Sequence, residues 1–355
     1  MNQALVDKIT AAVLYEGYIL YPYRPSLKNR QRWAFGGLYP QAYSLAQGGT
    51  EAWEMQTQCL VVGGESATLE VKIRFLHLVD RVVGEFVQPL AGLPQGDEPE
   101  FRTVDTLQVG ERRFQSWQEA VEREIALGES DLKNVLRQPQ RKGFSFPARR
   151  ELEGLRSPAG LVVGALVRQQ QPVEGSIELA AERLTEDLSK ITVRVRNHTA
   201  LEDPSRHSRN DALLHALVST HALLGVRGGE FISLLDPPQV WREAAAGCRN
   251  IGTWPVLVGE EGEKSTMLSA PIILYDYPQV APESPGDLFD STEIDEILTL
   301  RILTLTDEEK REVAAVDERG RAILERTESL AREQLAGLHG IMRGLRPVHG
   351  EVAND

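Results

Sequence analysis

EAWEMQTQCLVVGGESATLEVKIRFLHLVDRVV, residues 51–83, decides the fold class of this chain, because apolar and polar residues alternate through most of it. Every second residue from Met55 to Val61 is apolar or small, and the same period returns from Leu69 to His77. A period of two is typical of strands with one buried face. We therefore expect two strands here, joined by a turn at Gly63-Gly64.

The sequence downstream of this stretch predicts further strands. The pattern indicates strands at 161–169, 175–181 and 188–197, and Phe144 alternates with Phe146. Residues 112–127 fit a helix and a strand about equally well, so both readings stay open. Several short strands separated by turns predict a sandwich-like or barrel-like core between residues 50 and 200.

The pattern changes after Asp203-Pro204. The run ALLHALVSTHALL, residues 212–224, follows potential cap residues and is apolar nearly all round, which predicts a core helix. We expect strands at 231–235 and 255–258 and a short helix near 240–246.

The stretch from Pro271 to Lys310 begins with an apolar run at 272–275 that predicts a buried strand. The capping spacings Thr292/Asp295 and Thr306/Glu309 predict two helices. Residues 283–318 contain twelve acidic and three basic residues, so they form either a solvated face or an acidic docking surface.

These patterns together predict an α+β protein. Its β-rich, sandwich-like or barrel-like N-terminal part is followed by a mixed part with a core helix and by charged C-terminal helices. We expect an aromatic and basic N-terminal segment at 1–50, a β-rich domain at 51–203, a mixed α/β part at 204–312 and a charged helical tail at 313–355.

Composition limits the function classes. The chain has 355 residues, 41% hydrophobic and 26% charged, as in ordinary globular proteins. A net charge of −13 argues against a nucleic-acid binder. Two cysteines fit a reducing compartment, and the apolar run 161–167 is too short to span a bilayer. We expect a cytoplasmic protein without a membrane span.

The segment Tyr15–Tyr43 has the most unusual composition of the chain. It holds six of the eight tyrosines, and residues 17–50 include four basic and no acidic residues. Tyrosine and arginine are enriched at protein interfaces. The alternative is a hairpin whose tyrosines pack on a sheet beside a solvated basic loop. The candidate partner-binding residues are Tyr21, Tyr23, Arg24, Lys28, Arg30, Arg32 and Trp33.

Signals for chemistry are weak. Asp211 and His215 share a helical spacing, but His221 would lie on another face, so we expect no metal site and no cofactor. We interpret the histidines as buried helix residues. No nucleophile elbow, phosphate loop or CxxC motif is present. A hydrolase-like enzyme that uses Cys248 with a histidine of the 198–221 region, or a metal carrier, stays open as the alternative.

Three segments of the sequence carry a resemblance to a known family. They are Leu14–Pro40 (LYEGYILYPYRPSLKNRQRWAFGGLYP), Asp211–Pro238 and Gly252–Glu309, and the likeness covers about half of the chain. The chain resembles uncharacterised accessory proteins encoded with bacterial high-affinity uptake nickel–iron hydrogenases. That resemblance implies a non-enzymatic accessory protein that binds a protein partner, either hydrogenase subunits or a maturation factor, during assembly or maturation. It supplies no catalytic residues.

Overall fold

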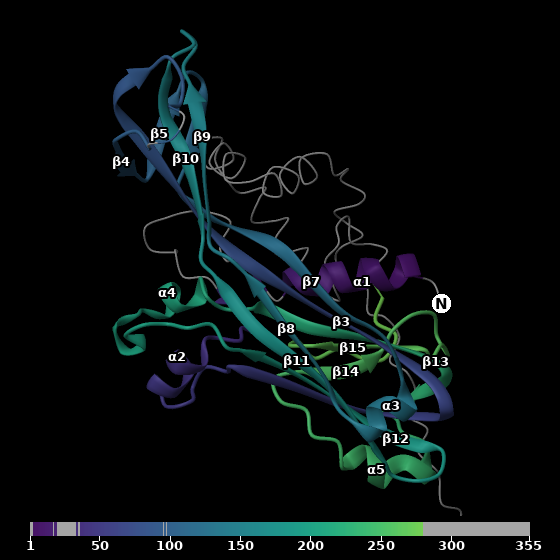
Figure 1. Cartoon of the computed structure of the whole chain (residues 1–355). Coiled ribbons are helices and arrows are strands. Elements are labelled where there is room, and N and C mark those ends of the chain that lie inside the picture. Colours follow the sequence, from purple (N-terminus) through teal and green to yellow (C-terminus); the bar gives the residue numbers. More distant parts are fainter. Residues whose placement is uncertain are drawn as a thin grey trace, which may run out of the picture.

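The structure is a computed structural model that describes residues 3–16, 18–19, 33–34, 36–94, 96 and 98–279. Within these residues the chain is mainly β, with one large antiparallel sheet that curls into a half-barrel and a few short helices (Figure 1). The strands of the sheet are β3 (Glu54–Leu90), β4 (Phe101–Val104), β7 (Trp117–Asp131), β8 (Gln140–Phe146), β9 (Arg149–Arg156), β10 (Val162–Gln170), β11 (Val173–Arg183), β12 (Leu188–Asn197), β13 (Val218–Ile232), β14 (Trp254–Leu257) and β15 (Thr266–Ala270).

Two small hairpins and several short helices accompany the sheet. The hairpins pair β1 with β2 and β5 with β6. Their bounds are β1 (Tyr18–Ile19), β2 (Trp33–Ala34), β5 (Thr106–Val109) and β6 (Arg112–Gln115), and the helices are α1 (Gln3–Glu16), α2 (Gln41–Ala46), α3 (Leu132–Arg137), α4 (Arg209–Leu213) and α5 (Arg242–Ala246), with 3-10 turns η1 (Pro204–Arg206) and η2 (Gln239–Trp241).

Strand β3 organises the sheet, because five other strands pair with it along its 37 residues. On one edge it pairs with β12, then β7, then β4. On the other edge it pairs with β13 and then with β10. A strand of this length would measure roughly 120 Å if straight, so the natural twist of strands coils it through the whole molecule.

The alternation read from the sequence is confirmed on β3. Odd-numbered side chains from Met55 to Val61 and from Ala67 to Phe75 face the interior of the half-barrel and are buried. Even-numbered Leu60, Leu76 and Leu78 face the outer side, where other clusters cover them. Both faces of this strand therefore contribute to burial, which is why it can run through the centre of the protein.

The turn expected at Gly63-Gly64 is wrong, since β3 continues through both residues. A side chain at Gly63 would place its Cβ 3.0 Å from the Cα of Gly229 on β13. The two glycines allow the two backbones to approach closely. Glycine inside a strand pattern indicates such an approach as readily as it indicates a turn.

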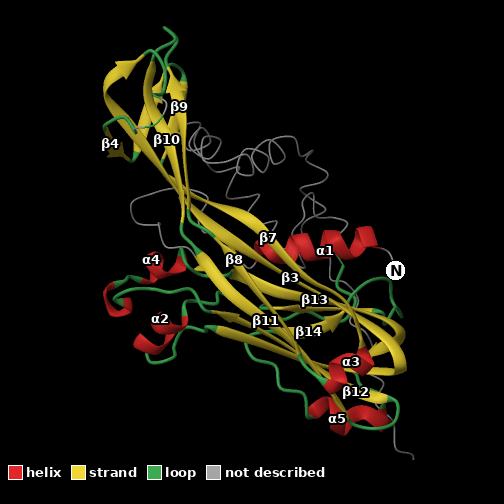
Figure 2. Ribbon diagram, viewed as in Figure 1, coloured by secondary structure: helices red, strands yellow, loops and turns green. Residues whose placement is uncertain are grey.

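The interior of the half-barrel forms the main core, which α3 covers, while α1 covers part of the outer face. Leu132 and Val135 of α3 are buried in the interior cluster with side chains of β3, β11 and β12. On the outer face, Val6, Ile9 and Val13 of α1 pack on side chains of β13, β14 and β15 (Figure 2).

The end of β3 leaves the body and forms a projecting arm with β4, β9 and β10 (Figure 1). The β5–β6 hairpin contributes Val109, Leu107 and Phe114 to a small cluster on one face of the arm. Phe86 and Val162 belong to a second small cluster. The arm thus has its own thin apolar layers and does not share the main core.

The core helix expected at 212–224 is wrong. The structure has the short helix α4 followed by β13, whose first seven residues are all buried. Residues that are apolar on all sides fit a helix in a core and a strand covered on both faces, and periodicity does not separate the two. The Ser208 cap with Asp211 starts a real helix, which ends after one turn. The described residues are therefore mainly β, without the core helix of the expected mixed part.

Other expectations have mixed outcomes. The strand expected at 272–275 is wrong, because the strand in this region, β15, ends at Ala270 and a bend follows. The strands expected at 161–169, 175–181, 188–197 and 255–258 are confirmed, as is the short helix near 240–246, and residues 112–127 form strands. The helices expected between 292 and 346 lie outside the described residues.

Gly164, which lies on β10 opposite Glu85 of β3 at a register shift in the arm, tests the close packing there. An added Cβ would lie 2.4 Å from the carbonyl oxygen of Gly84. We expect Gly164→Ala to lower the free energy of unfolding by about 1–3 kcal/mol, measured by urea denaturation. Gly143→Ala is the control, because an added Cβ there would lie 3.9 Å from the Gly175 carbonyl oxygen, an ordinary contact distance. Equal stability of the two variants would contradict the close approach of Gly164 to Gly84.

Candidate functional site

Most of the partner-binding residues expected from the sequence lie outside the residues that the structure describes. Tyr21, Tyr23, Arg24, Lys28, Arg30 and Arg32 lie outside the described residues. Trp33 is in β2, where it pairs with Ile19 of β1. The role of this segment stays a prediction.

The structure does describe where the segment joins the body. Gly36 has a φ of 57°, and a Cβ there would lie 2.2 Å from the Cβ of Pro271. The Gly36 carbonyl accepts a hydrogen bond from the Thr220 amide, at 3.1 Å. Two residues later, Leu38 bridges to Leu217, just before β13. The segment Tyr15–Tyr43, called the Tyr- and Arg-rich segment below, therefore contacts Pro271, the residue that follows β15, through Gly36.

Exposed large apolar side chains occur just before β14, on β14 and in the loop that follows β15. The exposed fractions are 41% for Ile251, 45% for Trp254, 73% for Ile273 and 78% for Tyr275. Trp254 pairs with Ala270, and the chain after β15 bends and returns to β14, where Asp276 and Tyr277 bond to Leu257. We refer to these four residues as the edge surface.

Local sequence explains why side chains, rather than free backbone, are presented here. Strand β14 is the last strand of the sheet on this side. The Leu257 amide donates to Asp276 Oδ1 at 2.8 Å, and its carbonyl accepts from the Tyr277 amide at 2.7 Å. The alternate position, Pro255, has no N–H to offer. The outer edge of β14 is thus closed to pairing with another strand.

The loop that carries Ile273 and Tyr275 is held at several points. Leu274 is buried in the cluster under α1. Asp276 accepts a hydrogen bond from the Ser233 hydroxyl in addition to the bond from Leu257. Because neighbours on both sides of Tyr275 are fixed, its exposed ring is presented on a defined backbone. Such a surface can bind another protein.

The four histidines singled out in the sequence are dispersed. His198 contacts the Ser176 hydroxyl and His207 the Glu202 carbonyl. His215 precedes β13 and His221 lies within it, so the interpretation as helix histidines is wrong. Among the described residues, no three His, Cys, Asp or Glu side chains are placed to hold a metal ion.

His77 is the histidine that sequence reasoning passed over as one more member of the β3 alternation. Its Nε2 donates to the Gln171 carbonyl at 2.8 Å. Burial lowers its pKa to about 4, and the nearby Arg123 guanidinium also lowers it. Arg123 lies over the Phe146 ring at 4.4 Å and donates to Gln170. The odd numbering of His77 on β3 is the signal that places it inside.

Cys248 is not brought to the histidines. It packs against a cluster that contains Leu60, Leu188 and Ile232. His221 lies eleven residues from Ile232 on β13, roughly 35 Å along the strand. Burial raises the pKa of the Cys248 thiol, which disfavours the nucleophilic thiolate.

Comparisons with known proteins do not place this chain in a family. No protein-family model and no curated protein matches this chain. None of the helices in the described part of the chain is long and apolar enough to cross a membrane.

His77 makes stability depend on pH. The unfolded chain binds a proton near pH 6.5 but the folded protein only near pH 4, so stability is lost as the pH falls through this window. We expect His77→Phe to remove up to ~2 kcal/mol of the stability loss between pH 7 and pH 5, measured by urea denaturation.

The control variant is Phe146→Leu, which alters the same ring cluster without removing a titrating group. It should keep the wild-type pH dependence. A His77→Phe protein with an unchanged pH dependence would show that the histidine is not held neutral in the fold.

Proposed function

We propose that this protein is a non-enzymatic accessory protein that binds a protein partner through the edge surface and the adjoining Tyr- and Arg-rich segment. The observation that carries the proposal is the group of four exposed apolar side chains at the end of the sheet, next to the point where that segment enters the body.

The composition of the edge surface supports a binding role. Exposed apolar residues are common singly, but a group of them marks an interaction site more often. Tryptophan and tyrosine are enriched among the residues that contribute most to protein binding. Replacing one of them by alanine at the centre of an interface weakens the binding free energy by about 2 kcal/mol or more. Trp254 and Tyr275 provide one of each, and Ile251 and Ile273 add aliphatic area.

The fixed backbone also supports binding. A loop that is ordered before it meets its partner loses less conformational entropy on association. Asp276 and Tyr277 tie the loop to Leu257, and Leu274 is buried beneath it. Ile273 and Tyr275 are therefore presented at little entropic cost.

The resemblance to hydrogenase-associated proteins supports the choice of partner. We propose hydrogenase subunits or a maturation factor, met in the cytoplasm during assembly or maturation of a nickel–iron hydrogenase. The net charge of −13 favours a protein partner over nucleic acid.

The test is co-purification from a host that expresses the hydrogenase. We expect tagged wild-type protein to retain a hydrogenase subunit or a maturation factor. Trp254→Ala combined with Tyr275→Ala should weaken this interaction at least ~10-fold, because both rings lose their contact area.

The matched control is Leu45→Ala with Val240→Ala, which removes two exposed apolar side chains elsewhere. It should bind like the wild type. If both double variants retain the partner equally, the edge surface is not the interface. If wild-type protein retains neither kind of partner, the hydrogenase role itself is contradicted.

A further inference from the structure

The first residues of β13 contain a strained stretch of backbone that packing alone does not require. Ser219 has a φ of 53°, in the left-handed region, and it is fully buried. In this region the Cβ approaches the following carbonyl oxygen, so residues other than glycine are seldom found there. The pairing of β13 with β3 shifts register between Val218 and His221, so Ser219 and Thr220 form a β-bulge.

The peptide unit between Ser219 and Thr220 is held at both ends. Its carbonyl oxygen, on Ser219, accepts a hydrogen bond from Nδ1 of His221 at 3.1 Å. Its amide, on Thr220, donates to the Gly36 carbonyl at 3.1 Å. The unit follows Ser219 directly, so fixing its orientation restricts the backbone dihedrals of that residue.

The other side of Ser219 is fixed as well. The Leu38 amide donates to the Leu217 carbonyl at 2.9 Å, and the Leu217 amide donates to the Leu38 carbonyl at 3.0 Å. The Thr220 hydroxyl also donates to the Leu217 carbonyl, at 2.8 Å. Gly36 and Leu38 therefore hold the bulge from both sides, and both belong to the Tyr- and Arg-rich segment.

The polar side chains of the bulge add to the strain. Ser219 Oγ and His221 Nε2 are buried, and neither has a hydrogen-bond partner among the described residues. A buried polar atom without a partner destabilises the folded state. A conformation of this kind persists only where its surroundings determine it, and such positions are common in regions that switch between two states.

We propose that the Ser219–Thr220 bulge is a strained latch for the Tyr- and Arg-rich segment. Docking of Gly36 on Thr220 holds Ser219 in the left-handed region, and release of Gly36 lets Ser219 relax. The strain opposes docking, so the segment leaves the body more readily than its contacts alone would permit. The latch rests on the proposed function, because it governs when the segment becomes available to a protein partner.

Hydrogen–deuterium exchange of the Thr220 amide in the full-length protein tests the latch, since this amide exchanges only after it leaves the Gly36 carbonyl. Ser219→Gly removes the left-handed penalty and keeps both hydrogen bonds of the peptide unit. We expect this variant to exchange the Thr220 amide about 3- to 10-fold more slowly than the wild type, because the docked state is no longer strained.

The matched control is Asp203→Gly. Asp203 is also left-handed, with a φ of 45°, but it is exposed and precedes η1. This variant relieves the same kind of strain elsewhere in the chain, so it should exchange the Thr220 amide at the wild-type rate.

Gly36→Ala is the opposite change. Its Cβ would lie 2.2 Å from the Cβ of Pro271 at a left-handed φ of 57°, which disfavours docking. We expect this variant to exchange the Thr220 amide at least ~10-fold faster than the wild type, because the acceptor is displaced.

Three outcomes would overturn the latch. The first is a wild-type exchange rate in Ser219→Gly, and the second is equal slowing in Asp203→Gly. The third is a wild-type rate in Gly36→Ala, which would show that Gly36 does not hold this peptide unit. These measurements use no partner, so their failure leaves the co-purification test of the proposed function unaffected.

Discussion

The hydrogen bonds along both edges of β3 are the constraint on which the rest of the fold depends. One edge passes from β12 to β7 to β4, and the other from β13 to β10. Each exchange of neighbours changes the direction in which the sheet continues, so a single strand produces both the curled body and the arm. The close approach of Gly63 and Gly229 lies near the first of these exchanges. A bulkier residue there would push β13 away from β3 and open the interior.

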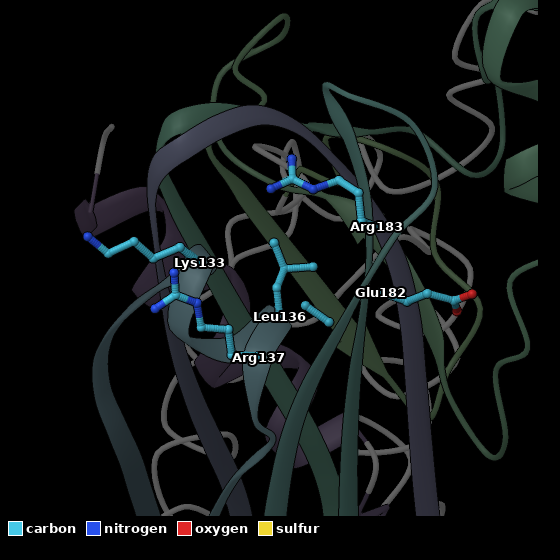
Figure 3. A pocket seen from close by; sticks show the side chains of 6 residues that line it. Lys133, Leu136, Arg137, Glu182 and Arg183 are labelled. Atoms are coloured by element: carbon cyan, nitrogen blue, oxygen red, sulfur yellow. The ribbon is translucent and has the colours of Figure 1, made fainter.

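This arrangement leaves two different surfaces. Beyond β13 the sheet ends at β14, whose backbone is closed by Pro255 and by the bonds from Asp276 and Tyr277. What remains exposed there is aromatic and aliphatic, which favours contact with another protein. Beside β11, α3 covers the interior with its apolar face and presents Lys133 and Arg137 outward (Figure 3). The two surfaces therefore differ in chemistry.

Much of the fold could be predicted from period-two alternation, but the central strand β13 could not. Alternation located β3, β10, β11 and β12, because each of these strands has a pattern that differs between its faces or is bounded by turn residues. It failed for β13, since a strand covered on both faces has no polar side to distinguish it from a core helix. The edge surface was missed for another reason. Ile273 and Tyr275 belong to the run 272–275 that was expected to be a buried strand, and the bend after β15 leaves both exposed.

The central claim of this account is that a protein partner touches the edge surface. A photo-crosslinking residue in place of Tyr275, introduced in cells that make the hydrogenase, tests it most directly, with the same residue in place of the equally exposed Val240 as reference. The account predicts a discrete crosslinked product from position 275 that contains a hydrogenase subunit or a maturation factor, and no such product from position 240. Identical products from both positions, or none from position 275, would contradict it.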